Sequence, residues 1–200
     1  MTRLDELLYE MIRYDDRDVK RIQHFLKVHE FARLIGLEEK LDPYTQEILE
    51  AAAIVHDIGI HKAEEKYGRN TGKYQELEGP GEARTMLTAL SWPEEVIDRV
   101  CYLVGHHHTY DNIDGMDYQI LVEADFLVNL FEDGATPDTQ KSVFARNFRT
   151  EGGKSLFGLM FESGEEKTGE NTCHCRETFG GTRHRSCLKM QPFRKRMSGR

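Results

Sequence analysis

Apolar residues recur at helical spacing along most of the chain. Between residues 16 and 35 they stand three or four positions apart, which predicts one long helix. Asp15 or Asp16 is the expected N-cap of this helix, and Gly36 is its expected stop. A shorter segment, 4–12, carries its apolar residues on one face and predicts a preceding amphipathic helix.

Proline and glycine residues mark where further elements begin and end. Asp42 followed by Pro43 is a helix start signal, and the run 48–58 predicts a largely buried helix that ends at Gly59. The polar segment 61–82 holds several glycines, which predicts a long loop. Helices are predicted to follow at residues 82–90, 93–105, 118–130, 137–148 and 154–161. No segment alternates with the period of a strand, so the expected fold class is all-α, a compact bundle of about six or seven helices.

Composition and charge divide the chain in two. The 38% of hydrophobic residues among 200 are enough for one buried core, which we expect in residues 1–162. Residues 163–200 are rich in Gly, Ser, Arg and Lys without periodicity, which predicts a basic, disordered C-terminal tail. The net charge of −8 therefore comes from an acidic body, which argues against strong nucleic-acid binding.

Neither a membrane span nor a disulfide framework is expected. No apolar run approaches the roughly 18 residues of a membrane helix. Acidic residues stand where a signal peptide needs positive charge, so a cytoplasmic location is expected. Four cysteines are too few for a disulfide framework. The tail sequence Cys173-His174-Cys175, with His184 and Cys187 downstream, is spaced too tightly for the usual zinc site.

The pair His56-Asp57 is the first candidate for chemistry, because it ends a helix whose preceding residues 51–55 are all apolar. A buried carboxylate beside an imidazole is costly unless its charge is compensated. A metal ion bound by both side chains would compensate it. A hydrogen-bonded pair in which Asp57 caps the helix is the other interpretation, and the dipeptide leaves both open.

Other polar residues also stand in apolar surroundings. Asp125 has mainly apolar neighbours three and four positions away, so it needs either a metal ion or a salt-bridge partner from another helix. Of the three consecutive imidazoles at 106–108, at most two can face one site. His24 and His29 both lie on the long helix, and periodicity does not choose between them.

The order of these residues resembles the HD-domain superfamily of metal-dependent phosphohydrolases, whose signature is a His, then a His-Asp pair, then a distant Asp. The stretch RIQHFLKV around His24 is similar to the family's first-histidine helix, AAIVHDIG to its central motif and EADFL to its last motif. The resemblance covers residues 16–130. It implies an HD-domain-like helical bundle and selects His24 from the two histidines of the long helix. The implied metal ligands are His24, His56, Asp57 and Asp125.

The same resemblance implies a reaction and a cofactor. One divalent metal ion (Mn, Fe, Co, Ni, Zn or Mg) would activate a water molecule to cleave a phosphate ester of a nucleotide or another small phosphorylated metabolite. Asp57 would take a proton from that water, and His107 would act on the phosphate or on the leaving oxygen. Whether the chain forms a homo-oligomer is left open by the sequence. The expected substrate-binding residues are Arg21, Lys27, Lys62, His106 and His108.

Departures from the family pattern narrow the choice of activity. Gln75 stands where family members with two metals have a histidine, so a dinuclear site is not expected, although Glu76 or Glu78 could substitute as ligands. The Gly-Tyr-Pro element of the cyclic-di-nucleotide phosphodiesterases is missing from residues 109–112. Two other functions stay open: a non-catalytic metal-binding helical regulatory module, and a di-iron oxygenase of the HD type, which needs the dinuclear site.

Overall fold

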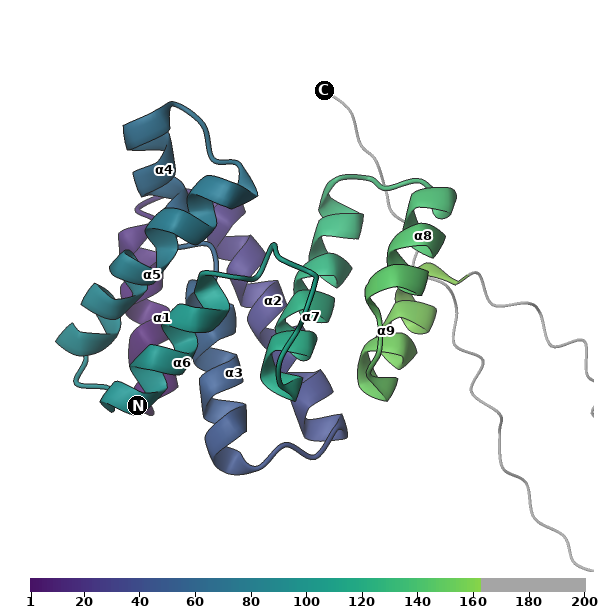
Figure 1. The fold of residues 1–200 in the computed structure, drawn as a ribbon, viewed down its shortest axis with the longest axis horizontal. Coiled ribbons are helices and arrows are strands. Elements are labelled where there is room, and N and C mark those ends of the chain that lie inside the picture. Colours follow the sequence, from purple (N-terminus) through teal and green to yellow (C-terminus); the bar gives the residue numbers. More distant parts are fainter. Residues whose placement is uncertain (163–200) are drawn as a thin grey trace, which may run out of the picture. The chain divides into compact units, whose positions relative to one another are not determined.

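The computed structural model describes residues 1–162, which form nine α-helices and no strand (Figure 1). The expected all-α fold class is confirmed for this part of the chain. None of these nine helices is both long and apolar enough to span a lipid bilayer. The predicted tail at 163–200, with its cysteines and histidines, lies outside the described residues. The helices are α1 (Arg3–Tyr14), α2 (Val19–Glu38), α3 (Pro43–Val55), α4 (Gly59–Tyr67), α5 (Gly72–Ala89), α6 (Glu94–Val104), α7 (Met116–Glu132), α8 (Pro137–Asn147) and α9 (Glu151–Phe161).

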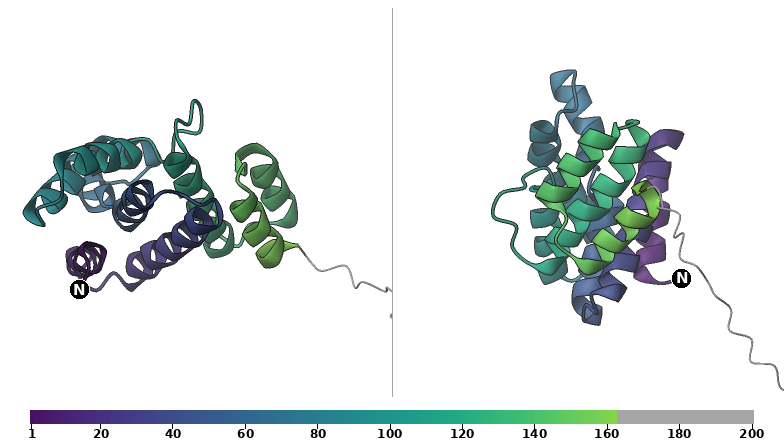
Figure 2. Two further views of the ribbon diagram at one scale, coloured as in Figure 1. Left: turned by 90° about the horizontal axis from the view of Figure 1, so that it is seen from below. Right: turned by 90° about the vertical axis from the view of Figure 1, so that its right-hand side faces the viewer.

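Three helices, α2, α3 and α7, form the centre of the bundle. α2 packs against α3 and α7, and α3 packs against α7 as well. Large apolar side chains, among them Phe25, Leu49 and Ile120, are buried in the shared core. Around this centre α1 covers α3, α4 and α5 form a pair that continues into α6, and α8 and α9 lie beside α7 (Figures 1 and 2). Polar residues on the facing sides of the three central helices are therefore brought together.

Side-chain caps define several helix starts. Asp42 accepts hydrogen bonds from two backbone N–H groups of the first turn of α3, and Pro43 fills the first helical position, as the sequence predicts. The prediction of Asp15 or Asp16 as the cap of α2 is wrong. Asp18 caps this helix, because its carboxylate accepts the backbone N–H three residues further on.

Gly36 does not end α2, which continues to Glu38, so this prediction is wrong. The reason is close packing, since a Cβ at Gly36 would overlap the Oε1 atom of Gln46 on α3. Glycine there accommodates the Gln46 side chain of α3 and does not mark a change of backbone conformation. The predicted end of α3 at Gly59 is also too late, because α3 ends at Val55 and Gly59 begins α4.

The predicted loop at residues 61–82 is wrong, because α4 and α5 fill most of it. Gly59 and two glycines of this region, Gly72 and Gly79, stand at close contacts with neighbouring segments. A Cβ on Gly59 would stand 2.6 Å from the carbonyl oxygen of Gln75 and 2.7 Å from the backbone nitrogen of Gly79, both on α5. Gly68, at φ +65°, ends α4 in the left-handed conformation. With these additional helices, residues 1–162 contain nine helices, more than the six or seven expected from the sequence.

Gly59→Ala is expected to lower the free energy of unfolding by about 1–3 kcal/mol, because the added methyl group meets backbone atoms of α5. Gly81→Ala is the matched control, since a Cβ there has no neighbour within 4 Å, and it should raise this free energy by about 0.5–1 kcal/mol. Urea unfolding followed by circular dichroism measures both. Equal unfolding midpoints for Gly59→Ala and the unchanged protein would contradict this account of the α4–α5 contact.

Candidate metal centre

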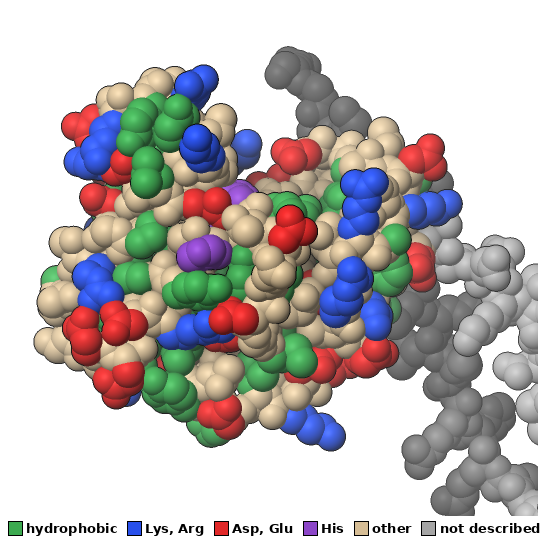
Figure 3. Space-filling model, in the orientation of Figure 1, with side chains coloured by type: hydrophobic (Ala, Val, Ile, Leu, Met, Phe, Trp, Pro, Cys, Tyr) green, Lys and Arg blue, Asp and Glu red, His purple; other side chains and the backbone are tan. Residues whose placement is uncertain are grey.

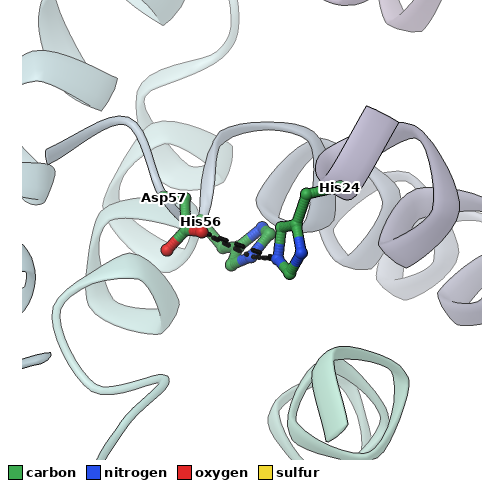
Figure 4. A group of neighbouring side chains, drawn as sticks. All are labelled: His24, His56 and Asp57. Carbon is green, nitrogen blue, oxygen red and sulfur yellow. Dashed lines mark hydrogen bonds and ion pairs between the residues drawn. The ribbon is translucent and has the colours of Figure 1, made fainter. Parts of the chain in front are cut away.

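Four side chains from the three central helices meet at one point. His24 lies on α2, His56 and Asp57 directly follow the last residue of α3, and Asp125 lies in the middle of α7. The alanines at 51–53 are fully buried, and such small side chains let neighbouring helices approach the end of α3 closely. Figure 4 shows His24, His56 and Asp57 pointing toward one another. We name the four residues the ligand cluster.

The distances within the ligand cluster are short. His24 Nε2 lies 3.2 Å from His56 Nε2 and 3.5 Å from Asp57 Oδ2. Asp125 Oδ1 lies 3.3 Å from His24 Nε2 and 3.6 Å from His56 Nε2. The side chains of His56 and Asp125 are 1% and 7% exposed, whereas that of Asp57 is 20% exposed and lines a pocket. The ligand cluster is therefore buried on one side and accessible on the other.

Hydrogen bonds on the far side of each imidazole determine which ring nitrogen is free. His56 donates Nδ1–H to the carbonyl oxygen of Ala53 at 2.9 Å, and His24 donates Nδ1–H to the Glu132 carboxylate at 3.1 Å. Glu132 is ionised, because its hydrogen bonds with Lys27 and His24 outweigh the effect of burial and lower its pKa. The two Nε2 atoms therefore face each other with lone pairs, which repel unless a proton or a metal ion lies between them.

The protein groups by themselves favour a proton at this point. Burial lowers the pKa of His24, but the hydrogen bond with Asp125 and the charges of Asp57 and Asp125 outweigh burial and raise this pKa to about 9. The pKa of His56 is raised against burial by the same two carboxylates. Burial also opposes the ionisation of Asp57 and Asp125, yet the neighbouring histidines hold both pKa values below their usual range. The ligand cluster thus attracts positive charge.

A divalent cation fits these donors. Ligand atoms about 2.1 Å from a metal ion lie about 3.0 Å apart in octahedral and about 3.4 Å apart in tetrahedral geometry. The distances given above run from 3.2 to 3.6 Å. The ligand atoms of His24, His56 and Asp57 all lie within 4.8 Å of one another. These three donors, with the Asp125 carboxylate close to both Nε2 atoms, form a mixed nitrogen and oxygen site that suits Mn, Fe, Co, Ni, Zn or Mg.

His107 and His108 continue the constellation on the other side of Asp57. His107 is fully buried and donates Nδ1–H to the carbonyl oxygen of Val104 at 2.8 Å. Its Nε2 atom has no hydrogen-bond partner within residues 1–162 and lies 3.5 Å from Asp57 Oδ1. Asp57, His107 and His108 form a second group whose ligand atoms lie within 4.8 Å of one another. Asp57 therefore points Oδ2 toward His24 and His56 and points Oδ1 toward His107.

Gln75, the residue that argues against a second metal, is buried on α5 next to His108. Its Nε2 donates to the carbonyl oxygen of Asn70 at 2.6 Å, and its Oε1 accepts from His108 Nε2 at 2.7 Å. Burial and the neighbouring His107 lower the pKa of His108 to about 4, so His108 is neutral near pH 7. Its Nδ1 atom is then the nitrogen that carries a lone pair.

Glu76 and Glu78, the possible substitute ligands, belong to neither of the two groups of candidate metal ligands found in residues 1–162. Glu76 accepts hydrogen bonds from the backbone N–H of His108 and from the hydroxyl of Thr109, each at 3.0 Å. Glu78 is paired with Lys66. Both carboxylates therefore already have hydrogen-bond or ion-pair partners. Within the described residues, neither belongs with Asp57 to a group of possible metal ligands.

The five side chains expected to bind the substrate do not lie together in the structure. Arg21 lines the pocket beside the ligand cluster, where Glu64 holds its guanidinium at 2.7 Å. His108 lies in the second group. The remaining three are bonded elsewhere: Lys27 to Glu132, Lys62 to Glu65, and His106 to the carbonyl oxygen of Tyr102, on whose ring it stacks.

The ligand cluster opens into a pocket of about 250 Å³. Its lining is polar, with a single apolar residue among the side chains that form it. On the face drawn in Figure 3, histidine side chains reach the surface beside acidic ones. The lining residues are Asp18, Lys20, Arg21, His24, Asp57, Ile60, Asn70, Asn129, Glu132 and Asp133.

Helical spacing could have found pocket residues that the sequence reasoning missed. Lys20 stands four positions before His24 on α2, and Asn129 stands four positions after Asp125 on α7. The Asn129 Nδ2 atom donates to Asp125 Oδ1 at 2.8 Å and so fixes that carboxylate. Glu132, seven positions after Asp125 on α7, follows the same helical spacing. No such spacing marks Asn70, which lies between α4 and α5 and reaches the pocket through tertiary contacts.

Comparison with known proteins identifies the family. The family model described as HD domain matches residues 21–145, which is more than half of the chain and contains the whole ligand cluster. The chain therefore belongs to the HD-domain family, whose members are typically phosphohydrolases, and the His/Asp cluster is a candidate metal site typical of this family. No curated protein and no solved structure matches the chain.

The metal-free protein is expected to lose stability as the pH rises through about 7 to 9. The folded pKa of His24, about 9, exceeds the ordinary value of 6.5. The protonated imidazole therefore stabilises the fold fully below the ordinary value, and this contribution, on the order of 3 kcal/mol, is lost as the pH passes the folded value. Melting temperatures measured in the presence of a chelator should fall across this window.

His24→Gln should flatten this pH dependence, because it removes the titrating imidazole. His29→Gln is the matched control on the same helix, since His29 Nε2 lies 3.1 Å from Glu50 Oε2, outside the ligand cluster. This control should keep the fall in melting temperature. The same fall in both variants would show that another group is responsible.

Proposed function

We propose that this HD-domain protein is a metal-dependent phosphohydrolase that cleaves a phosphate ester of a nucleotide or another small phosphorylated metabolite. The proposal is carried by the ligand cluster, which opens into a pocket that also presents Lys20 and Arg21. A metal ion and Lys20 together suit a phosphate group, because they neutralise its negative charge. The Arg21 guanidinium is already paired with Asp18 and Glu64.

His24, His56, Asp57 and Asp125 would hold the metal ion. When bound, a divalent cation polarises a phosphoryl oxygen and makes water more acidic near neutral pH. The chain prepares its own donors for this, since both imidazoles direct Nε2 into the ligand cluster and Asn129 fixes the Asp125 carboxylate. The accessible side of the ligand cluster is the pocket, where a phosphate would approach.

Asp57 is the proposed general base. Its side chain lines the pocket, and its pKa stays low because the neighbouring histidines outweigh the effect of burial. An ionised carboxylate in this position can accept a proton from a water molecule in the pocket. His107 lies behind Asp57, with its Nε2 atom 3.5 Å from Asp57 Oδ1, and it is not a pocket-lining residue. Any action of His107 on the leaving oxygen would therefore pass through Asp57.

The size and polarity of the pocket limit the substrate. Pockets that enclose a whole ligand usually measure about 300–1,000 Å³, and this one is smaller, at about 250 Å³. It fits a phosphate with an adjoining polar group, while the rest of the substrate lies outside. A small hydrophilic phosphate ester meets this limit directly. A nucleotide meets it when its base stays outside the pocket.

Two alternatives from other functional classes are distinguishable by measurement. A regulatory module would bind metal without turning over a substrate. The di-iron oxygenase is favoured by the second group, Asp57, His107 and His108, which could take a second metal ion. Two irons per chain with consumption of oxygen would support the oxygenase. The cytoplasmic location expected from the sequence stays a prediction.

Asp57→Asn is expected to reduce metal-dependent phosphate release by at least about 100-fold, because it loses an anionic ligand and a proton acceptor. Release is measured from nucleotides and sugar phosphates with Mn, Co, Ni, Mg or Fe, together with the metal content of the protein. Asp98→Asn removes an exposed carboxylate that is paired with Arg84 on the surface, and it should keep full activity. An unchanged protein that binds no metal would overturn the proposed site.

Lys20→Met should raise KM for the phosphate ester about 10-fold and leave kcat nearly unchanged, because Lys20 supplies charge to the bound phosphate. Lys20 is exposed at the pocket, and within the described part of the chain its ammonium group pairs with no carboxylate. Lys141→Met, which removes an exposed lysine of α8, is the control of equal charge. Equal KM values for the two variants would exclude Lys20 from phosphate binding.

A further inference from the structure

Glu132, the last residue of α7, supports His24 from the side away from the ligand cluster. Its Oε2 accepts the Nδ1–H of His24 at 3.1 Å, and its Oε1 is paired with the ammonium group of Lys27. The Glu132 side chain is 14% exposed. Since Lys27 follows His24 by one turn of α2, these bonds connect α2 to the end of α7. A largely buried carboxylate with both oxygens bonded is a fixed acceptor.

The other buried imidazoles of the constellation are held differently. His56 and His107 donate Nδ1–H to the backbone carbonyl oxygens of Ala53 and Val104. Those acceptors are present whatever side chains surround them. The free nitrogen of His24 depends instead on a side chain, Glu132, and therefore on a contact that a single substitution removes.

The carboxylate has two effects on the imidazole. It accepts a hydrogen bond and cannot donate one, so it keeps the His24 proton on Nδ1 and leaves the Nε2 lone pair directed at His56 and Asp125. It also makes the imidazole a stronger electron donor, which is the common effect of a carboxylate hydrogen-bonded to a metal-binding histidine. Without it, the proton could move to Nε2 and block the metal-binding nitrogen.

We propose that Glu132 is a positioning residue of the metal site, which sets the tautomer of His24, and that Lys27 holds Glu132 in place. This inference rests on the proposed metal site and extends it to two residues that would not touch the metal ion. It also gives Lys27 a role other than the substrate binding expected from the sequence.

Glu132→Gln tests the proposal, because the amide keeps the size of the side chain and loses its charge. The dissociation constant for Zn²⁺ or Co²⁺ is measured on the full chain by competition with a chromophoric chelator. We expect it to rise about 10–100-fold. Long-range proton–nitrogen NMR spectra of the metal-free protein at high pH should show a larger share of the Nε2–H tautomer of His24 in the variant than in the unchanged protein.

Asp133→Asn is the matched control. Asp133 is the next residue and lines the same pocket, so its substitution removes the same charge from nearly the same place without touching His24. The dissociation constant of the Asp133→Asn variant for Zn²⁺ or Co²⁺ should stay within about twofold of the value for the unchanged protein, because exposed charges are screened. Lys27→Met should raise the constant by less than Glu132→Gln does. Melting temperatures in chelator check that each variant is folded.

The outcomes of these measurements distinguish a failure of this inference from a failure of the proposed function. If the unchanged protein binds neither metal, the metal site itself is overturned. If it binds metal and Glu132→Gln binds equally well, only the role of Glu132 is overturned. Equal weakening in Glu132→Gln and Asp133→Asn would assign the effect to general charge and overturn the positioning role. If Glu132→Gln does not fold, Lys27→Met decides, and an unchanged dissociation constant in that variant overturns the proposal.

Discussion

His24 Nε2 and His56 Nε2 face each other at 3.2 Å, with carboxylate oxygens of Asp57 and Asp125 beside them, inside a bundle whose core is mainly apolar. Lone pairs and negative charges do not gather in a protein interior unless a positive charge compensates them. The surrounding helices must therefore be stable enough to hold these groups together. Buried apolar residues on α2, α3 and α7 provide that stability, because they pack the three helices against one another on the sides that carry no ligand.

The two sides of the ligand cluster have different physical tasks. On the buried side, backbone carbonyl groups and Glu132 accept the outer N–H groups of the imidazoles and leave Nε2 free. On the accessible side, Asp57 meets a small polar pocket with the cations of Lys20 and Arg21 nearby. The buried side thus fixes the orientation of the candidate ligand atoms, while the pocket is the side from which a phosphate group would approach in the proposed function.

The α4–α5 pair forms part of this pocket, through Ile60 on α4 and Asn70 between the two helices. The pair can lie close because Gly59 has no Cβ, which would collide with backbone atoms of Gln75 and Gly79 on α5. A Cβ on Gly79 would instead meet Val104 of α6. Gln75 on α5 then reaches His108 across from α6 and holds its ring. A region whose glycines resemble those of a loop is therefore packed helix, and it contributes side chains to the site.

Periodicity and caps in the sequence determined the helical class and the start of α3 at Pro43, because these are local properties of neighbouring residues. Polar residues in apolar surroundings indicated His56, Asp57 and Asp125 as candidates, and the resemblance to the HD domain implied the set of four ligands. The resemblance to the HD domain chose His24 over His29, which periodicity could not do. Only the tertiary structure decided that Gly36 and Gly59 are packing positions, that Lys27 is bound by Glu132, and that Glu132 supports His24. Each of these depends on contacts between residues far apart in the chain, and spacing along the sequence does not record which helices come to lie together.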